Sequence, residues 1–486
     1  RFRTRTEAHI DGVIDAGVLS EPMLLPHGQK PLSTRIIVKE KTDGTLKSRF
    51  CVRGCHQTHG VNYDNDAIYA PVAERISVRT VFAVAAVLCA HIPTLAINLA
   101  FLYGDMPDDY QVYVKPPAGC TFGPDKVCRL LKSLYGLKQA PSIFRNVLHE
   151  FIVSLGFAPC HNDPCVYFRF TASVKTLLAI HVDDILCICT DLPTLDTFKS
   201  AVKNRFQVKD QGPINGKTFL GLEVDHDQAQ GVINLHCDSF IRRSLATLDI
   251  DPSTIYPAST PLSKAGVTGS PPAAQVPLSQ NQLRQLSGIL TYATVTCRPD
   301  LAVAASKLSS TTWTDIKVDD LTAGKRAIQY LAGTLKNQPK FGLRYNKAVF
   351  DTLDQASTLL CYADSDYAGD EATCKSRSGH AIMRCNALIY WSSRLQTTIA
   401  LSSTAAELTS LSDLCRRLIW ITDLLNQLGC PQRLVPIYED NKPAIAIAYR
   451  ANLSTRVRHM RIRDLARGND QDEIILAECK NGIDQV

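Results

Sequence analysis

The stretch Lys175-Thr-Leu-Leu-Ala-Ile-His-Val-Asp-Asp-Ile-Leu-Cys-Ile-Cys-Thr190 decides the fold. Two apolar runs, Leu177 to Val182 and Ile185 to Cys189, flank the adjacent acids Asp183 and Asp184. Each run has strand length and β-branched content, so the stretch predicts a hairpin with both carboxylates at its bend. Two anions between buried strands cost free energy unless a cation or hydrogen-bond donors meet them, and oxygen ligands suit Mg²⁺. The alternative is an Asp-Asp turn that faces solvent, and this stretch alone leaves both readings open.

The composition indicates a folded protein of two or three domains. The chain has 486 residues, of which 45% are hydrophobic and 21% charged, which excludes a disordered chain. A formal charge of +6 permits a polyanionic partner without requiring one. Seventeen cysteines without regular spacing favour reduced thiols in an intracellular protein over a disulfide framework. The chain starts at Arg1 without a signal-peptide pattern, which predicts a piece of a longer product.

One segment, Val81 to Tyr103, carries no Asp, Glu, Lys or Arg and is long enough to span a bilayer. Pro93 divides it into a helix-like half and a strand-like half. We therefore expect a buried helix followed by a buried strand, Thr94 to Leu102, and no membrane span. A second strand is expected at Thr218 to Val224.

The remaining patterns divide the chain into regions. Residues 35–53 predict a basic hairpin, and residues 142–155 and 192–206 predict helices. Residues 251–279 are rich in Pro, Ser, Thr, Gly and Ala, which indicates a linker. Strands followed by βαβ elements from about residue 350 predict an independent α/β domain.

An ordered set of motifs resembles the reverse transcriptase and ribonuclease H of copia-type LTR retrotransposons, over nearly the whole chain. The motifs of the first part are Lys47-Ser-Arg-Phe-Cys-Val-Arg-Gly54, Gly60-Val-Asn-Tyr-Asp64, Ala70-Pro-Val-Ala73, Leu134-Tyr-Gly-Leu-Lys-Gln-Ala-Pro141, His181-Val-Asp-Asp184, Phe219-Leu-Gly-Leu-Glu223, Arg298-Pro-Asp300 and Gly333-Thr334. Those of the second part are Tyr362-Ala-Asp-Ser-Asp-Tyr-Ala-Gly-Asp370, Lys375-Ser-Arg-Ser-Gly379, Trp391-Ser-Ser393, Leu401-Ser-Ser-Thr404 and Asp440-Asn441.

The resemblance implies an α+β fold, namely a right-hand polymerase (fingers, palm and thumb) followed by a ribonuclease H-like α/β domain. The expected boundaries are 1–225 for fingers and palm, 226–350 for thumb and connection, and 351–486 for the ribonuclease H-like domain. The implied partners are an RNA template, a DNA primer, an RNA–DNA hybrid, dNTPs and other Pol or Gag products of the element. The implied location is intracellular, in a cytoplasmic virus-like particle or the nucleus.

In this family the polymerase site holds two Mg²⁺ ions with three carboxylates, and this chain lacks one of them. Asp183 and Asp184 match the pair in the hairpin. The third acid belongs four places before Ala100, where this chain has Ala96. The next acids along the chain, Asp105, Asp108 and Asp109, lie beyond the strand, and we interpret them as a solvated turn. Since two divalent ions need all their anionic ligands, the sequence predicts an impaired polymerase site.

Four residues match family positions near the incoming nucleotide or the templating base pair. Lys47 and Arg49 could contact the triphosphate, or could be solvated charges of the hairpin. Phe101 matches the residue under the incoming sugar, and an ordinary core aromatic is an equal alternative. Gln139 belongs to the segment beside the templating pair.

The ribonuclease H half shows a similar partial loss. Asp364, Glu407 and Asp440 match three of the four acids that hold two Mg²⁺ ions in the family. The fourth position is Arg461, a cation that would oppose metal binding. Asp464, about one helical turn later, is a weak candidate for compensation. The two readings left open are therefore an impaired enzyme and an inactive remnant that only binds nucleic acid.

A cluster of cysteine and histidine residues near the N-terminus could bind zinc, but ordinary packing is the favoured interpretation. Its ligand types occur at Cys51, Cys55, His56 and His59. They lie along a strand and turn with no second cysteine pair, so we expect ordinary packing there.

Overall fold

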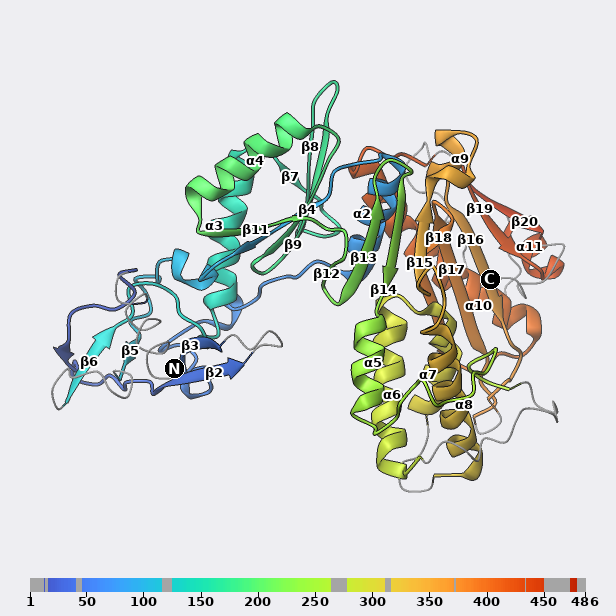
Figure 1. The fold of residues 1–486 in the computed structure, drawn as a ribbon, viewed down its shortest axis with the longest axis horizontal. Helices are drawn as coiled ribbons and strands as arrows, with labels where there is room; N and C mark the ends of the chain where they lie inside the picture. The colour runs from blue at the N-terminus through green and yellow to red at the C-terminus, as the bar shows by residue number, and fades with distance from the viewer. Residues whose placement is uncertain are drawn as a thin grey trace.

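The computed structural model describes residues 13, 16–40, 46–115, 125–263, 278–310, 316–370, 373–432, 434–449 and 473–478. Within these residues the chain forms five β-sheets with helices packed against them (Figure 1). The N-terminal sheets lie at one end of the molecule and the C-terminal sheet at the other (Figure 1).

The N-terminal region contains two small sheets. The predicted basic hairpin is confirmed, with β2 and β3 antiparallel and Thr34 opposite Val52. The strands are β2 (Thr34–Glu40) and β3 (Leu46–Val52) in one sheet, and β1 (Met23–Leu24), β6 (Lys126–Arg129) and β5 (Tyr113–Val114) in the other.

The central sheet has six strands in the order β11-β4-β10-β9-β8-β7. Its strands are β4 (Pro93–Ile97), β7 (Ala158–Pro159), β8 (Val166–Phe170), β9 (Lys175–His181), β10 (Asp184–Cys189) and β11 (Val208–Pro213). The alternate residues Leu178 and Ile180 pack with α3 (Ala140–Ser154) and α4 (Leu192–Arg205), whereas Leu177 and Ala179 pack in the cluster that contains α2 (Arg75–Val87). Both faces of the sheet are therefore covered, which explains why β9 and β10 are apolar at nearly every position.

Two expected strands are shorter than the sequence suggested. The strand expected at Thr94 to Leu102 ends at Ile97, because Leu99 takes φ +52 and the 3₁₀-helix η3 (Ala100–Tyr103) follows. The strand expected at Thr218 to Val224 is interrupted at Leu220 and Gly221, both with positive φ, so it becomes two strands of a hairpin. A buried helix followed by a buried strand is confirmed, and no helix among the described residues is long and apolar enough to cross a membrane.

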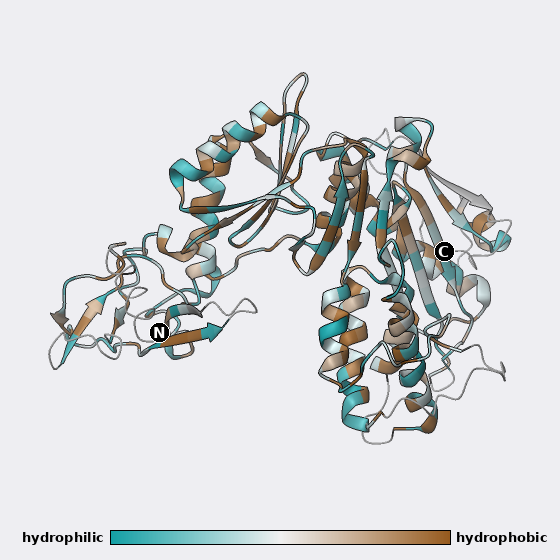
Figure 2. Cartoon of the chain, viewed as in Figure 1, coloured by the Kyte–Doolittle hydropathy of each residue, from teal (hydrophilic) through white to brown (hydrophobic). Residues whose placement is uncertain are grey.

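A four-stranded sheet and a group of helices follow. The strands are β12 (Lys217–Phe219), β13 (Leu222–Asp227), β14 (Val232–His236) and β15 (Leu343–Asn346). The helices are α5 (Asp238–Ala246), α6 (Gln280–Thr296), α7 (Ala302–Ser309) and α8 (Val318–Thr334). In Figure 2, α5 and α6 carry both teal and brown stretches, as expected for helices with one buried face.

The C-terminal sheet has the order β18-β17-β16-β19-β20, with β16 and β19 parallel. The elements are α9 (Leu353–Ser357), β16 (Leu360–Ser365), β17 (Arg377–Arg384), β18 (Ala387–Leu395), α10 (Ser403–Gln427), β19 (Leu434–Glu439), α11 (Lys442–Tyr449) and β20 (Glu473–Glu478). The expected boundary near residue 350 falls between β15 and β16, and the division into domains stays a prediction.

Candidate active sites

The acidic hairpin forms as predicted. His181 and Asp184 are opposite each other, so the turn between β9 and β10 consists of Val182 and Asp183 only. Val182 has φ +56, a conformation that a β-branched residue rarely adopts. Such strain is found mostly at functional turns and costs on the order of 1–3 kcal/mol.

The residue that should supply the third carboxylate lies directly beside this pair. Ala96 of β4 is the registered partner of Asp184 of β10, and the Ile97 amide donates to the Asp183 carbonyl at 2.9 Å. Position 96, where the motif predicts the third acid, therefore lies next to Asp184, but the side chain of Ala96 is only a methyl group. Asp105 and Asp108 are exposed beyond the strand, and Asp108 lies 3.6 Å from Arg129.

Two of the residues predicted to contact nucleotide gather around Tyr135, which sequence reasoning did not single out. The guanidinium of Arg49 lies 5.7 Å from the centre of the Tyr135 ring, and the Phe101 ring lies 5.0 Å away, edge to face. Burial raises the pKa of Tyr135, the charge of Asp183 raises it further, and Arg49 opposes them. Arg49 and Phe101 thus lie against one ring, that of Tyr135. The sequence signal was available, since Tyr135 belongs to the motif that ends at Pro141.

Gln139 is held by protein groups. Its side chain is buried, donates to the Asn62 carbonyl at 3.0 Å and accepts from Gln57 at 2.9 Å. These bonds join the segment before α3 to the residues after β3, so Gln139 supports this region from within. Lys47 lies in β3, but its side chain is outside the described residues.

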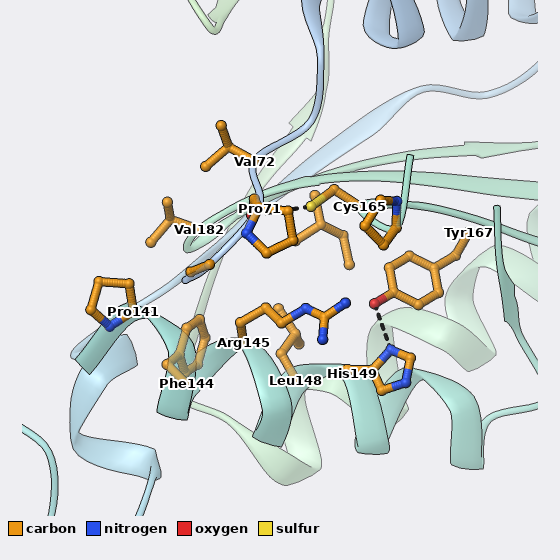
Figure 3. A pocket seen from close by; sticks show the side chains of 13 residues that line it. Pro71, Val72, Pro141, Phe144, Arg145, Leu148, His149, Cys165, Tyr167 and Val182 are labelled. Carbon is orange, nitrogen blue, oxygen red and sulfur yellow. Dashed lines mark hydrogen bonds between the residues drawn. The ribbon is translucent and has the colours of Figure 1, made fainter. Parts of the chain in front are cut away.

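A mostly apolar hollow borders the hairpin turn at Val182 (Figure 3). It is bounded by residues 70–72, α3, β8 and the hairpin. A hydrogen bond of 2.9 Å between His149 Nδ1 and the Tyr167 hydroxyl lies at one side, and the Cys165 thiol donates to the Pro71 carbonyl at 3.2 Å. The side chains labelled in Figure 3 are Pro71, Val72, Pro141, Phe144, Arg145, Leu148, His149, Cys165, Tyr167 and Val182.

A second acidic centre forms in the C-terminal sheet. One carboxylate oxygen each from Asp364, Glu407 and Asp440 lies within 4.8 Å of the others. Asp364 is on β16, Glu407 is on α10, and Asp440 follows β19. Because β16 and β19 are parallel neighbours with Tyr362 opposite Tyr438, their carboxyl ends bring Asp364 and Asp440 together. The three acids that the family motifs singled out therefore lie together.

Local bonds fix the helix that carries Glu407. The Ser402 hydroxyl caps the start of α10 by accepting from the Ala405 amide at 3.1 Å. The Ser410 hydroxyl donates to the Asp364 carbonyl at 2.8 Å, and His380 Nε2 lies 2.9 Å from the Ser410 carbonyl. These contacts hold the helix against β16 and β17, so the geometry of the three acids is set by the scaffold.

The environment raises the pKa values of Asp364 and Glu407. Burial raises the pKa of Asp364, and Asp440 adds to the effect. Burial and the charge of Asp364 raise the pKa of Glu407 to about 7. Glu407 Oε2 is buried and has no hydrogen-bond partner among the described residues. Carboxylates crowded in this way fit a divalent cation, which needs oxygen ligands and compensates their charge.

A fourth acid, Glu439, was missed from the sequence. It is fully buried on β19, and burial together with the charge of Glu407 raises its pKa to about 8. A signal was present, because Val435, Ile437 and Glu439 alternate along one strand and so place the glutamate on its apolar face. Arg461 and Asp464 lie outside the described residues.

Residues 51–59, where we expected ordinary packing and no zinc, include one buried cysteine. Cys51 is buried and its thiol donates to the Arg49 carbonyl at 3.7 Å. Every cysteine that the structure describes is free.

Comparisons with known proteins agree on the family. A family model described as reverse transcriptase (RNA-dependent DNA polymerase) matches residues 21–264. The retrovirus-related Pol polyprotein from transposon TNT 1-94 of Nicotiana tabacum is 31% identical over 457 residues, covering 90% of this chain and 32% of that protein. The corresponding polyprotein from transposon RE2 of Arabidopsis thaliana is 32% identical over 433 residues, covering 87% of this chain and 28% of that protein. The chain therefore spans about a third of the length of these relatives.

Solved structures support the fold. A foamy viral protease-reverse transcriptase in complex with dsDNA superposes with a TM-score of 0.52 at 14% identity, covering 98% of this chain and 83% of that chain. The predicted fold, a right-hand polymerase followed by a ribonuclease H-like domain, is thereby confirmed. The matched family model and the plant relatives show that the chain belongs to the reverse transcriptase (RNA-dependent DNA polymerase) family, with similarity to the Pol polyproteins of plant copia-type transposons.

Proposed function

We propose that this chain is the reverse transcriptase and ribonuclease H region of a retrotransposon Pol polyprotein, with a severely impaired polymerase site. The observation that carries the proposal is the pairing of Ala96 with Asp184. Nucleotide addition in this family needs three carboxylates around two Mg²⁺ ions, and a methyl group occupies the place of the third.

The missing acid weakens both affinity and geometry. Changes outside the ligand shell of metal sites cost about 10–100-fold, so loss of a ligand itself should cost more. Asp183 and Asp184 remain at the hairpin, and Arg49 and Phe101 both lie against the Tyr135 ring, which supports retained contacts for a nucleotide. We expect the site to retain binding of primer, template and nucleotide while the rate of nucleotide addition is strongly reduced.

The ribonuclease H centre is the better preserved of the two. Asp364, Glu407 and Asp440 would hold Mg²⁺, which in such sites activates the attacking water and neutralises charge on the phosphate. The three carboxylates come from β16, α10 and the end of β19. The Ser410 hydroxyl bonds α10 to β16, and β19 pairs with β16, so these elements would fix the approach of the scissile phosphate. We therefore propose residual cleavage of the RNA strand of an RNA–DNA hybrid.

A second candidate function is nucleic-acid binding without catalysis. It is favoured by an open hollow between α2, α6, α7 and β18 that is lined by several arginines and hydroxyl groups. Arg394 is exposed at its edge, and the guanidinium of Arg75 donates to the Thr296 hydroxyl at 3.0 Å. Cations and hydroxyl groups are the usual partners of backbone phosphates. The four arginines that line it are Arg75, Arg79, Arg394 and Arg417.

Two assays separate the proposals. Primer extension on a poly-rA template with Mg²⁺ or Mn²⁺ tests the polymerase, and clear synthesis by the unaltered chain would refute the impaired site. Cleavage of a labelled RNA–DNA hybrid tests the second centre, with Asp440→Asn as the inactive control. Binding of the hybrid without cleavage in the unaltered chain would leave only the nucleic-acid-binding function. Arg461→Asp asks whether the absent fourth acid limits cleavage.

A further inference from the structure

Four arginine side chains line one hollow, and none of them forms an ion pair with a carboxylate of the described residues. The hollow lies between α2, α6, α7 and β18 and has a volume of about 470 Å³. The four are Arg75, Arg79, Arg394 and Arg417, and the one acid of the lining is Glu74, which is exposed. The ion pairs of the described residues belong to other cations. Positive charge therefore gathers around the hollow without protein anions to neutralise it.

Arg79 is the most buried of the four cations, with an exposed fraction of 6%. Its Nε donates to the Ile389 carbonyl at 2.9 Å, and its Nη1 donates to the carbonyls of Val295 at 2.9 Å and Thr296 at 3.3 Å. Its Nη2 makes no hydrogen bond to a described residue. Burial lowers the pKa of Arg79 to about 10, which leaves the guanidinium charged at neutral pH. The guanidinium is thus fixed in place and keeps a donor for a ligand that enters the hollow.

Ring contacts fix cations on both sides of β18. The Arg79 guanidinium lies 4.1 Å from the centre of the Trp391 ring, and that of Arg417 on α10 lies 5.3 Å from the centre of the Tyr390 ring. Successive residues of a strand point to opposite faces, so the two cations stand on opposite sides of β18, the edge strand of its sheet. Arg75 is on the side of Arg79, because both donate to Thr296. A ligand that meets cations on both sides needs more than one anionic group.

We propose that the hollow binds a polyphosphate, a ligand with several adjacent phosphate groups, either free or as the 5′-triphosphate end of an RNA strand. Arginine suits phosphate because its guanidinium donates two parallel hydrogen bonds. The volume lies within the range of small-ligand pockets, about 300–1,000 Å³. Backbone phosphates of an intact duplex could reach Arg394 at the edge of the hollow, whereas Arg79 requires a group that enters it. The inference therefore goes beyond the proposed nucleic-acid-binding function.

Isothermal titration calorimetry of the full chain with inorganic triphosphate tests the proposal. EDTA is present, so that divalent cations at the acidic centres contribute no heat, and NaCl keeps the ionic strength constant. Inorganic orthophosphate is the comparison ligand. Triphosphate should bind at least about tenfold more tightly, because it can meet cations on both sides of β18 at once. Equal affinities of the two ligands would overturn the proposal.

Two substitutions on opposite sides of β18 locate the ligand. Arg75→Gln and Arg417→Gln each remove one charge and should weaken triphosphate binding about tenfold. Arg416→Gln is the matched control, because Arg416 adjoins Arg417 on α10, pairs with Asp413 at 3.2 Å and lies outside the lining. It should keep the affinity of the unaltered chain. Unchanged affinity in either of the first two variants would contradict a ligand that spans the edge strand.

Thermal midpoints with and without triphosphate show whether each variant folds. Because the ligand binds the folded state, it should raise the midpoint of the unaltered chain. If Arg75→Gln or Arg417→Gln does not fold, Arg394→Gln replaces it, since Arg394 is exposed at the edge of the hollow. This variant should weaken triphosphate binding about threefold. An unchanged affinity in Arg394→Gln would then overturn the proposal.

Further comparisons separate the two sources of phosphate and the competing site. Fluorescence anisotropy compares RNA that carries a 5′-triphosphate with the same RNA that carries a 5′-hydroxyl. Tighter binding of the first RNA, lost in Arg75→Gln, assigns the hollow to a strand end, and equal binding assigns it to a free polyphosphate. Triphosphate binding that is lost in Arg49→Gln and unchanged in Arg75→Gln would place the ligand near Tyr135 and overturn the proposal. If an RNA–DNA hybrid binds and triphosphate does not, the polyphosphate site is refuted and the nucleic-acid-binding function stands.

Discussion

Ala96 and Asp184 are directly opposed residues on adjacent antiparallel strands, with the Ile97 amide bonded to the carbonyl of the next acid, Asp183. Residues opposed in this way have Cβ atoms about 4.5–5.5 Å apart and point to the same face of the sheet. A carboxylate at position 96 would therefore lie beside Asp184 without any change in the backbone.

The first prediction follows from this pairing. Ala96→Asp should raise the rate of primer extension on poly-rA with Mg²⁺ at least tenfold, because it returns an anionic ligand to the site. Ala96→Asn is the matched control, since it has the same size without the charge and should give no gain. Equal rates for the two variants would show that the missing carboxylate is not what limits the site.

The acidic hairpin and the neighbouring strand β4 were predictable from the sequence. Strands β9 and β10 are covered on both faces, so they are apolar at nearly every position on either side of the acids. The three acids of the second centre were predictable because each lies in a motif. Glu439 was missed because it lies just outside the quoted motifs. Tyr135 was missed because its partners come from distant segments: its carbonyl accepts from the Val52 amide of β3, and Arg49 and Phe101 lie against its ring. The early end of β4 was missed as well, because Leu99 takes a left-handed conformation that its side chain does not favour.

A second prediction concerns pH. Burial lowers the pKa of His380 below its ordinary 6.5, with Asp413 acting to raise it and Arg394 to lower it further. The unfolded chain therefore binds the proton more readily, and the free energy of unfolding should fall as pH drops from about 6.5 toward the folded pKa. His380→Gln keeps a donor for the Ser410 carbonyl and should lose this contribution to the pH dependence.

The pH measurement compares urea unfolding of both proteins at pH 7.5 and 5.5. Glu407 and Glu439 act in the opposite direction, because their raised pKa values make the folded state gain stability as pH falls. The difference in pH dependence between the unaltered chain and His380→Gln isolates the contribution of His380 to the free energy of unfolding. Identical pH dependence in both proteins would contradict the prediction.

A third prediction concerns the contact between the polymerase part and the C-terminal sheet. Arg79 of α2 is buried, donates to the carbonyls of Ile389 and Val295 at 2.9 Å, and lies 4.1 Å from the centre of the Trp391 ring. Arg79→Ala leaves buried carbonyls unpaired and removes the cation–π contact, so it should lower the free energy of unfolding by about 2–5 kcal/mol.

Arg416→Ala is the control for that experiment, because it breaks only the exposed pair with Asp413 and should change stability by less than about 1 kcal/mol. Both are measured by urea unfolding. Similar losses for the two variants would mean that Arg79 does not join the two parts of the chain.

The last prediction tests the arginine-lined hollow as a contact for nucleic acid. Arg394 is exposed at its edge, so Arg394→Gln removes a charge without disturbing the core. If Arg394 neutralises one backbone phosphate, the slope of log affinity against log salt should fall in magnitude by about 0.7–0.9, and binding should weaken for all sequences alike. The measurement is fluorescence anisotropy with an RNA–DNA hybrid at several salt concentrations. Arg416→Gln, which lies outside the hollow, should keep the slope of the unaltered chain. The slope depends on the number of phosphates that the protein neutralises. An unchanged slope in Arg394→Gln would therefore mean that Arg394 contacts no phosphate and that the nucleic acid binds elsewhere on the protein.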